Sequence, residues 1–240
     1  MRRIFFFLAA SLILFSSCRW MGYKRIKGNG VIVTQDRHID HAERITLKGS
    51  YNVEITQGAT TSVKVEGDEN ILPFILVNQE GEGLVIRSKD HISYSTDHDI
   101  KIYITTDKLE QVNLQGSGNI SGKTKFTGGD KLTLRIAGSG DIKMEVNTPS
   151  IDANISGSGS MNMSGETKDQ NIHIAGVGNY NAENLKSESA RVKIAGSGDV
   201  KIFADASLDI NIAGVGSVFY KGNPTVKQHV AGSGEVKRLE

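Results

Sequence analysis

The feature that most constrains the fold is a Gly-x-Gly motif that recurs seven times, at spacings of 22, 19, 19, 20, 18 and 18 residues. A unit of this length is one supersecondary element, which cannot bury an apolar face alone and must stack on its neighbours. The sequence therefore predicts a repetitive, stacked architecture. The glycines are Gly116 and Gly118, Gly138 and Gly140, Gly157 and Gly159, Gly176 and Gly178, Gly196 and Gly198, Gly214 and Gly216, and Gly232 and Gly234.

The residues that flank each motif repeat as regularly as the glycines. An aliphatic residue, such as Ile155 or Ile174, stands two positions before each first glycine. An apolar residue, such as Met161 or Val200, stands four positions after it. Around these positions apolar and polar residues alternate with a period of two, as in residues 208–212. This alternation is typical of half-buried strands. Each unit is thus predicted to contain a strand, a Gly-x-Gly corner, a second strand and a second turn.

We therefore expect an all-β protein, and specifically a β-solenoid or right-handed β-helix with coils of about 18–22 residues and Gly-x-Gly corners. Glycine at the corners permits positive φ or a close approach of backbones. The alternative is an antiparallel sandwich or barrel of hairpins, with Gly-x-Gly in each hairpin loop. The nearly constant period favours the solenoid.

Residues 28–110 have the same character but no regular period. Residues 49–55 look like a degraded copy of the corner, and strands are expected around 45–47, 53–55, 62–66, 84–88 and 100–105. We expect one domain over residues 28–240, in which 28–110 form an irregular part that covers one end and 111–240 form the regular repeats. A separate small β domain over the irregular part is the alternative.

The amino terminus indicates export. Arg2 and Arg3 precede an apolar run of twelve residues, 4–15, which spans only about 18 Å as a helix against the ~30 Å of a bilayer core. Residues 1–17 are therefore predicted to be a cleaved signal peptide. Residues 14–18, Leu-Phe-Ser-Ser-Cys, resemble the lipobox of bacterial lipoproteins, with Phe15 where Leu, Val or Ile is usual. The alternative is an ordinary signal peptide followed by an incidental cysteine.

The lipobox resemblance implies that Cys18, the single cysteine of the chain, carries the lipid and that residues 18–27 form a lipidated tether. We expect an outer-membrane lipoprotein. Residues 19–30 lack acidic side chains, which favours the periplasm-facing over the surface-exposed orientation. The chain carries 28 basic and 27 acidic residues. This balance argues against a nucleic-acid partner and against an electrostatic grip on anionic lipid, so the expected contact with the membrane is the lipid anchor.

Three features resemble one known family: Gly116-Ser117-Gly118-Asn119-Ile120, the repeated Ala-Gly-Ser-Gly-Asp corners, and Gly-Ser-Tyr-Asn-Val-Glu-Ile at residues 49–55. They are similar to the auto-transporter adhesin head GIN domains, a family of unknown function, over roughly residues 40–230. The resemblance implies a β-solenoid fold and an adhesin-like role. It brings no catalytic residues with it.

Other site chemistries find little support in the sequence. A dinucleotide fingerprint needs a third glycine and a following helix, which the corners lack. A calcium site needs six to eight oxygen ligands, but the column three residues after each first glycine holds few carboxylates, and we expect it to satisfy turn backbone instead. His38, His41, His91 and His98 are predicted to be surface residues. We expect no metal and no cofactor. The column contains Asn119, Asp141, Ser160, Asn179, Asp199, Ser217 and Glu235.

A polar column is predicted on the outer surface, three residues before each first glycine. It is either a solvated face or a flat ladder that contacts glycan or an envelope protein. Its members are Asn113, Arg135, Asn154, His173, Lys193, Asn211 and His229. The function that we expect is a cell-envelope lipoprotein whose rigid solenoid acts in binding, adhesion or scaffolding without catalysis. The alternative is a carbohydrate-active, pectinase-like enzyme on the same scaffold.

Overall fold

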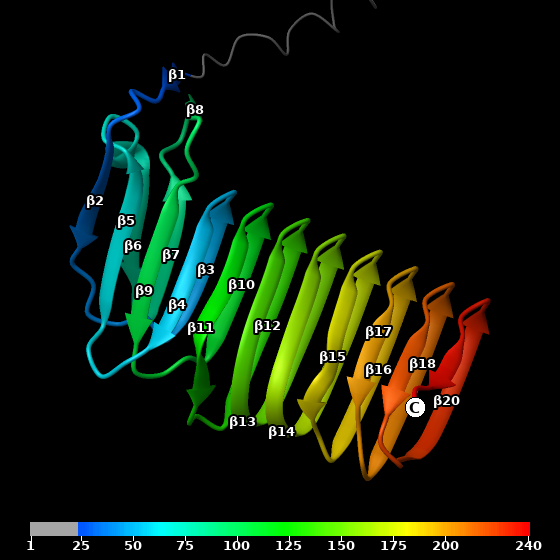
Figure 1. Cartoon of the computed structure of the whole chain (residues 1–240). Helices are drawn as coiled ribbons and strands as arrows, with labels where there is room; N and C mark the ends of the chain where they lie inside the picture. The colour runs from blue at the N-terminus through cyan, green and yellow to red at the C-terminus, as the bar shows by residue number, and fades with distance from the viewer. Residues whose placement is uncertain (1–23) are drawn as a thin grey trace, which may run out of the picture.

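The structure is a computed structural model that describes residues 24–240. The predicted signal peptide, Cys18 and the first part of the predicted tether lie outside the described residues. Over the described part the chain forms 21 strands and one short 3₁₀ helix, η2 (Leu72–Phe74). The strands stack along one axis (Figure 1). The predicted all-β solenoid is therefore confirmed.

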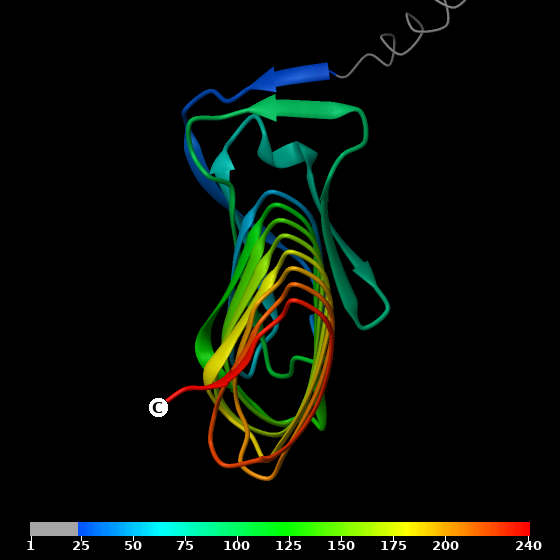
Figure 2. The same ribbon diagram turned by 90° about the vertical axis from the view of Figure 1, so that its right-hand side faces the viewer.

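Parallel pairing between successive coils builds the regular half. Viewed along the stack, each coil is a flattened loop with one strand on either side (Figure 2). Neighbouring coils pair parallel, and the strands that lead into the corners stay in register, as at Ile155, which pairs with Ile136 and Ile174. Hairpin strands would pair antiparallel, so the hairpin alternative is wrong. The strands are β10 (Gln111–Gly116), β11 (Asn119–Thr127), β12 (Lys131–Gly138), β13 (Asp141–Gly157), β14 (Ser160–Gly176), β15 (Asn179–Lys186), β16 (Ser189–Gly196), β17 (Val200–Phe203), β18 (Ser207–Gly214), β19 (Val218–Lys221), β20 (Thr225–Gly232) and β21 (Val236–Arg238).

The interior consists of aliphatic columns that continue from coil to coil. One column contains Ile136, Ile155, Ile174, Ile194 and Ile212, all buried and directly paired. Burial of one such side chain stabilises the fold by about 1.5–3 kcal/mol. The residues between them point outward, which confirms the predicted alternation.

The two glycines of each corner are required for different reasons, both set by the preceding coil. Gly157 has a φ of +133°, and a Cβ atom there would lie 2.2 Å from the carbonyl oxygen of Gly138. At Gly159 a Cβ atom would lie 2.2 Å from the carbonyl oxygen of Gly140 and 2.8 Å from Cγ2 of Ile136. Stacking in register thus excludes a side chain at both positions.

The predicted degraded corner proves to be the first of the column. Gly49 pairs with Gly116, so β3 (Arg44–Gly49) and β4 (Asn52–Gln57) form a coil of the same kind. Tyr51 stands where later coils have their second glycine. Its hydroxyl lies 2.6 Å from Oγ of Ser88, and burial raises the pKa of the phenol. No corner precedes this coil in the stack, so an aromatic ring fits there.

The irregular part continues the two faces of the solenoid beyond the first coil. β7 (Gly83–Ser88) pairs parallel with β3, and β9 (Lys101–Thr106) pairs parallel with β4. Antiparallel strands follow: β6 (Ile75–Glu80) on β7, β5 (Ser62–Asp68) on β9, and β2 (Ile32–Arg37) on β5. One apolar core runs through both parts. The sequence predicted β3, β4, β5, β7 and β9 but missed β2 and β6.

A further pair of strands crosses the end of the molecule. β1 (Lys24–Lys27) pairs parallel with β8 (Ile92–Ser95), so the last residues of the predicted tether form a strand. The buried carboxylate of Asp68 fixes the link to β2: it accepts hydrogen bonds from the Gly30 N–H at 2.6 Å and from the Thr96 hydroxyl. These bonds favour the ionised form, and the Thr96 hydroxyl is the main cause of the lowered pKa of Asp68.

Removing this carboxylate is expected to release β1. In Asp68→Ala, the Gly30 N–H and the Thr96 hydroxyl lose a charged acceptor, a loss of about 1.5–3 kcal/mol for each such bond. We expect amide exchange over residues 24–30 to accelerate at least tenfold, while exchange in the coils is unchanged. Hydrogen-exchange mass spectrometry measures this, with exposed Glu69→Ala as the control. Equal exchange in the two variants would contradict the role of Asp68.

Candidate functional site

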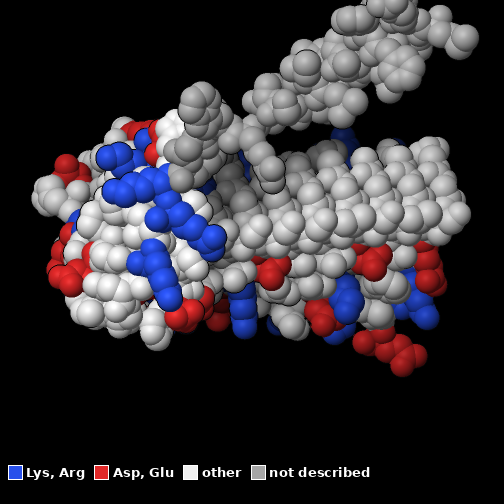
Figure 3. Space-filling view, turned by 90° about the horizontal axis from the view of Figure 1, so that it is seen from above, with Lys and Arg blue, Asp and Glu red and all other residues white. Residues whose placement is uncertain are grey.

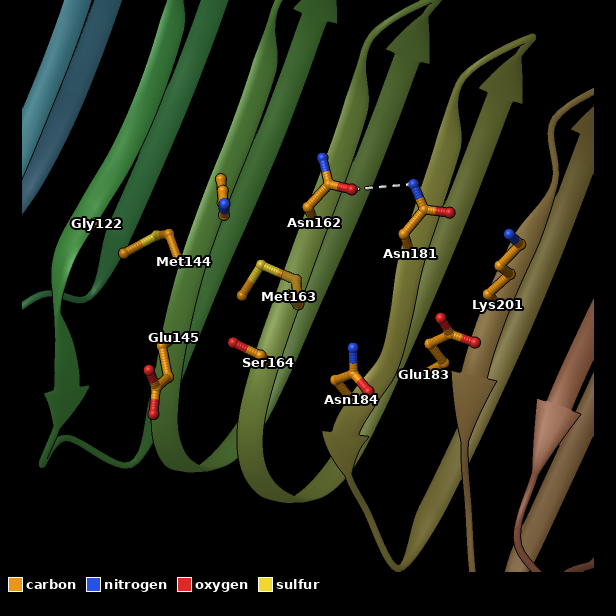
Figure 4. A pocket seen from close by; sticks show the side chains of 11 residues that line it. Gly122, Met144, Glu145, Asn162, Met163, Ser164, Asn181, Glu183, Asn184 and Lys201 are labelled. Carbon is orange, nitrogen blue, oxygen red and sulfur yellow. Dashed lines mark hydrogen bonds between the residues drawn. The ribbon is translucent and has the colours of Figure 1, made fainter.

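A shallow groove of about 530 Å³ lies on the outer face of the second strands of successive coils. We call it the outer groove. It crosses β11, β13, β14, β15 and β17, and Figure 4 shows its side chains. Its lining residues are Gly122, Lys143, Met144, Glu145, Asn162, Met163, Ser164, Asn181, Glu183, Asn184 and Lys201.

Two β-bulges shape the outer groove. Between β11 and β13 the register shifts after Ser121, and between β14 and β15 it shifts after Asn162. The β11 bulge inserts two extra residues, and the β15 bulge inserts one. A bulge bends its strand and re-aims the side chains beside it. The groove therefore lies where the ladder departs from regular stacking, on both sides of the regular pair β13–β14.

An outward column of polar side chains runs through the outer groove. Pairing places Lys143, Asn162, Asn181 and Lys201 on consecutive coils. Asn181 Nδ2 donates to Asn162 Oδ1 at 3.0 Å, and Figure 4 shows the two amides side by side. Each amide keeps further donors and acceptors for a ligand.

Charges in the outer groove are balanced. Glu145 and Glu183 supply two carboxylates, and Lys143 and Lys201 supply two ammonium groups. Glu183 also lies 3.5 Å from Lys221 Nζ. Met144 and Met163 also border the groove, and their side chains are buried. Such a site can form many hydrogen bonds along an extended polar chain, but it has no net charge to select an anion or a cation.

The predicted polar face is a continuous column in the structure. Register pairs its seven members coil by coil on the opposite side of the solenoid, beginning at Asn113 and Arg135. Three of them, Asn154, His173 and Lys193, line a smaller groove of about 310 Å³. The structure therefore brings the predicted residues together, and their role in binding stays a prediction. The other lining residues are Asp152, Asn171, Ile172 and Arg191.

The outer groove was not predicted, because a period-two pattern does not show where a register shifts. One signal for it was nevertheless present. The two longest spacings within the stack, 22 and 20 residues, belong to the coils that begin at Gly116 and Gly176. These coils contain the bulges of β11 and β15.

Three members of the column that follows the corners have the structural role predicted for it. Asp141 Oδ1 accepts the backbone N–H of Ser160 at 3.0 Å, and Asp199 Oδ1 accepts that of Ser217 at 2.9 Å. Asn179 in the same way accepts the N–H of Asp199 at 3.2 Å. Each acceptor thus binds the corner of the next coil.

Three carboxylates do converge elsewhere, within the irregular part and the first coils. Oxygens of Glu43, Glu82 and Glu110 lie within 4.8 Å of one another. Two cations pair with them: Arg44 lies 3.1 Å from Glu110 and 3.6 Å from Glu82, and Lys108 contacts both Glu110 and Glu43. Hydrogen bonds lower the pKa of Glu110, and the bond from Lys108 has a larger effect than the bond from Arg44. The cluster is therefore an ion-pair network.

A stacked, rigid scaffold with shallow polar grooves on its sides defines a β-solenoid binding module. The particular family follows from its sequence. The chain belongs to the family described as "Putative auto-transporter adhesin, head GIN domain", whose profile matches residues 42–224. This confirms the family resemblance of the corners.

Solved structures share the fold over most of this chain. A putative adhesin from Bacteroides fragilis has a TM-score of 0.80 at 26% identity, covering 89% of this chain and 100% of that one. A putative lipid binding protein from Parabacteroides distasonis has a TM-score of 0.76 at 27% identity, covering 90% and 100%. A putative adhesin from Parabacteroides merdae, at 22% identity and a TM-score of 0.72 over 90% and 99%, shows the fold alone. None of the curated proteins matches the chain.

These comparisons favour binding over catalysis. The family description and the matched structures name adhesins and a lipid binding protein, so the pectinase-like alternative has no support among them. An adhesin-like family also suggests an exported or envelope protein. Within residues 24–240 we find no helix that is both long and apolar enough to cross a bilayer.

Proposed function

We propose that this protein is a lipid-anchored binding module of the cell envelope, and that the outer groove holds a hydroxyl-rich glycan chain. The observation that carries the proposal is the groove itself: two bulges open it across several coils, and amides and carboxylates line it. Solenoid stacking fixes these groups before a ligand arrives, which reduces the entropy lost on binding.

The chemistry of the outer groove suits sugar hydroxyls. Amides both donate and accept, carboxylates accept, and ammonium groups donate, so each hydroxyl finds a partner of either kind. Net neutrality favours an uncharged chain over a polyanion. The groove is open at the surface, which suits the middle of a long chain better than an enclosed small molecule.

The lipid anchor is the second part of the proposal. The signal peptide predicted for residues 1–17 and the cysteine at residue 18 support it. Several acyl chains on one residue would give a stable attachment without a membrane-spanning helix. We place the protein at the outer membrane, facing the periplasm. An envelope protein as ligand is the second candidate, because the predicted polar face is equally exposed and periodic.

Replacing the acylated residue tests the anchor. Cells that express the parent chain are expected to incorporate labelled palmitate into it and to retain it in the membrane fraction. In Cys18→Ala the palmitate label is expected to be lost, because no sulfur remains to form the thioether. Conservative Ser17→Ala serves as the control. Palmitate incorporation that persists in Cys18→Ala would overturn the lipid anchor.

A glycan array followed by titration tests the groove. We expect the parent to bind a neutral glycan and Asn162→Ala/Asn181→Ala to bind it about tenfold more weakly, since each lost hydrogen bond contributes about 0.5–1.5 kcal/mol. The matched control is Asn154→Ala/His173→Ala on the other side of the solenoid. Loss of binding in the control alone would move the site to the predicted polar face.

A further inference from the structure

The end of the molecule that carries β1 combines positive charge with exposed aliphatic side chains. Lys24, Arg25 and Lys27 are all exposed on β1. Val31 and Ile32, which follow the short link to β2, are 51% and 42% exposed. We call these five residues the basic end. Figure 3 shows that Lys and Arg gather over this end, whereas the row of corners on the same face is free of them.

The basic end is held in a fixed shape. β1 is paired along its whole length with β8, and Gly28 N–H donates to the Ser95 carbonyl at 2.8 Å. Asn70 Nδ2 donates to the carbonyl oxygen of Lys27 at 2.8 Å. The Asp68 carboxylate accepts a hydrogen bond from the Gly30 N–H, which fixes the backbone between β1 and β2. The three cations are therefore presented by ordered backbone and not by a loose tether.

The charges of the basic end are available to a partner. Over residues 24–240, none of its three cations lies within 4.0 Å of a carboxylate oxygen. Two acids on neighbouring segments are engaged elsewhere: Asp68 is buried and hydrogen-bonded, and Asp90 pairs with Arg87 at 3.0 Å. Two others are exposed beside the basic end, Asp97 and Glu69, whose backbone N–H donates to the carbonyl oxygen of Val31. The three cations outnumber these two carboxylates, so this end keeps a net positive charge although the chain as a whole is nearly neutral.

We infer that the basic end docks on an anionic lipid bilayer. Basic residues next to exposed aliphatic ones are the chemistry of an interfacial contact, in which cations meet headgroups and apolar side chains enter the boundary. The place in the sequence agrees, because β1 begins six residues after the proposed lipidated cysteine. The cellular setting of this inference rests on the proposed envelope anchor. It differs from the expectation, drawn from net charge, of no electrostatic grip on anionic lipid.

This docking would orient the module. With the basic end on the headgroups and a lipid at the same end, the protein is fixed to the bilayer at two points. A rigid body with two contacts keeps one orientation, whereas a protein on a single flexible anchor turns freely. The outer groove would then hold a defined direction relative to the membrane.

Vesicle sedimentation tests the inference with the full chain in a Cys18→Ala background, so that the outcome does not depend on acylation. The vesicles are pure phosphatidylcholine, or phosphatidylcholine with 30% phosphatidylglycerol by design. We expect tighter binding to the anionic vesicles. The ratio of the two partition coefficients cancels the contribution of the amino-terminal apolar segment, which is the same in every variant.

The triple variant Lys24→Gln/Arg25→Gln/Lys27→Gln removes the positive charge of the basic end. We expect its preference for anionic vesicles to be lower than that of the parent by roughly a hundredfold, or about fivefold per cation. In the parent, we expect this preference to weaken as the salt concentration rises. The control triple, Lys125→Gln/Lys168→Gln/Lys186→Gln, removes the same number of charges from exposed lysines near the second turns of the coils. Equal losses in the two triples, or none in either, would overturn the inference.

A final variant separates a bilayer from a soluble polyanion. Val31→Ser/Ile32→Ser keeps every charge and removes only the apolar contacts. We expect its binding to anionic vesicles to weaken about threefold to tenfold, because buried apolar area contributes at a bilayer boundary. Unchanged binding would show that the partner is not a bilayer. Failure of the glycan titration leaves this result untouched, so the two proposals are tested separately.

Discussion

Gly157→Ala is expected to lower the free energy of unfolding by about 3–6 kcal/mol, which approaches the whole stability of many domains. Two costs combine at this position. The φ of +133° is strained for any residue with a side chain, and the new Cβ atom would lie 2.2 Å from the carbonyl oxygen of Gly138. Relief would require the two coils to move apart, which breaks the ladder between them.

Two controls separate these costs. Gly128 also has a positive φ, +83°, but a Cβ atom there meets nothing within 4 Å, so Gly128→Ala carries only the conformational cost of about 1–3 kcal/mol. Ser158→Ala, between the two glycines of the same corner, is expected to change stability by less than about 0.5 kcal/mol. Urea unfolding followed by circular dichroism measures all three. A Gly157→Ala midpoint no lower than that of Gly128→Ala would contradict the packing argument.

The second large effect is expected at the centre of the solenoid. Tyr180 is fully buried, burial raises the pKa of its phenol, and its hydroxyl donates to Oε1 of Gln170 at 2.9 Å. Tyr180→Ala removes a large side chain from a closed interior and is expected to cost about 3–5 kcal/mol. Tyr180→Phe keeps the ring but leaves the Gln170 oxygen without its donor, at a cost of about 1–3 kcal/mol.

A double variant tests whether the cost of Tyr180→Phe comes from the orphaned amide. Tyr180→Phe/Gln170→Leu removes both partners of this bond, together with the long bonds from Gln170 Nε2 to the carbonyl oxygens of Leu185 and Phe203. It is expected to recover part of the stability lost in Tyr180→Phe. Half-buried Tyr220→Phe is the matched control, with a change below about 0.5 kcal/mol. Thermal melts of the parent, Tyr180→Phe, Gln170→Leu and the double variant measure the coupling between the two side chains. If the double variant is as unstable as the sum of its single variants, the pair does not act as a unit.

The regular half could be predicted because the same packing requirements recur at each of the seven corners. Each corner needs glycine under the carbonyl of the coil before it, and each strand needs apolar residues on one side. Tyr51 shows the limit of the rule: the place of a second glycine admits an aromatic ring where no corner precedes it in the stack. The corner motif alone therefore identifies the coil, and position in the stack decides its second residue.

The rest depended on contacts between segments that do not repeat. β1 and β8 are joined across nearly seventy positions of sequence, and no local pattern indicates their pairing. Gln170 occupies an inward column of apolar residues, between Ile151 and Ala190. Its partners explain it: the Tyr180 hydroxyl, and the carbonyl oxygens of Leu185 and Phe203. The outer groove exists because two coils carry extra residues, which the spacing showed and the alternation concealed.

The central claim is that the outer groove is the binding surface, and hydrogen exchange with and without a bound glycan tests it most directly. The account predicts slower exchange over residues 181–184, where the β15 bulge leaves backbone groups out of the regular ladder, and over the neighbouring strands of the groove. Coils β18 to β21 should be unaffected. Protection confined to residues 152–154, 171–173 and 191–193 of the opposite face would contradict the claim.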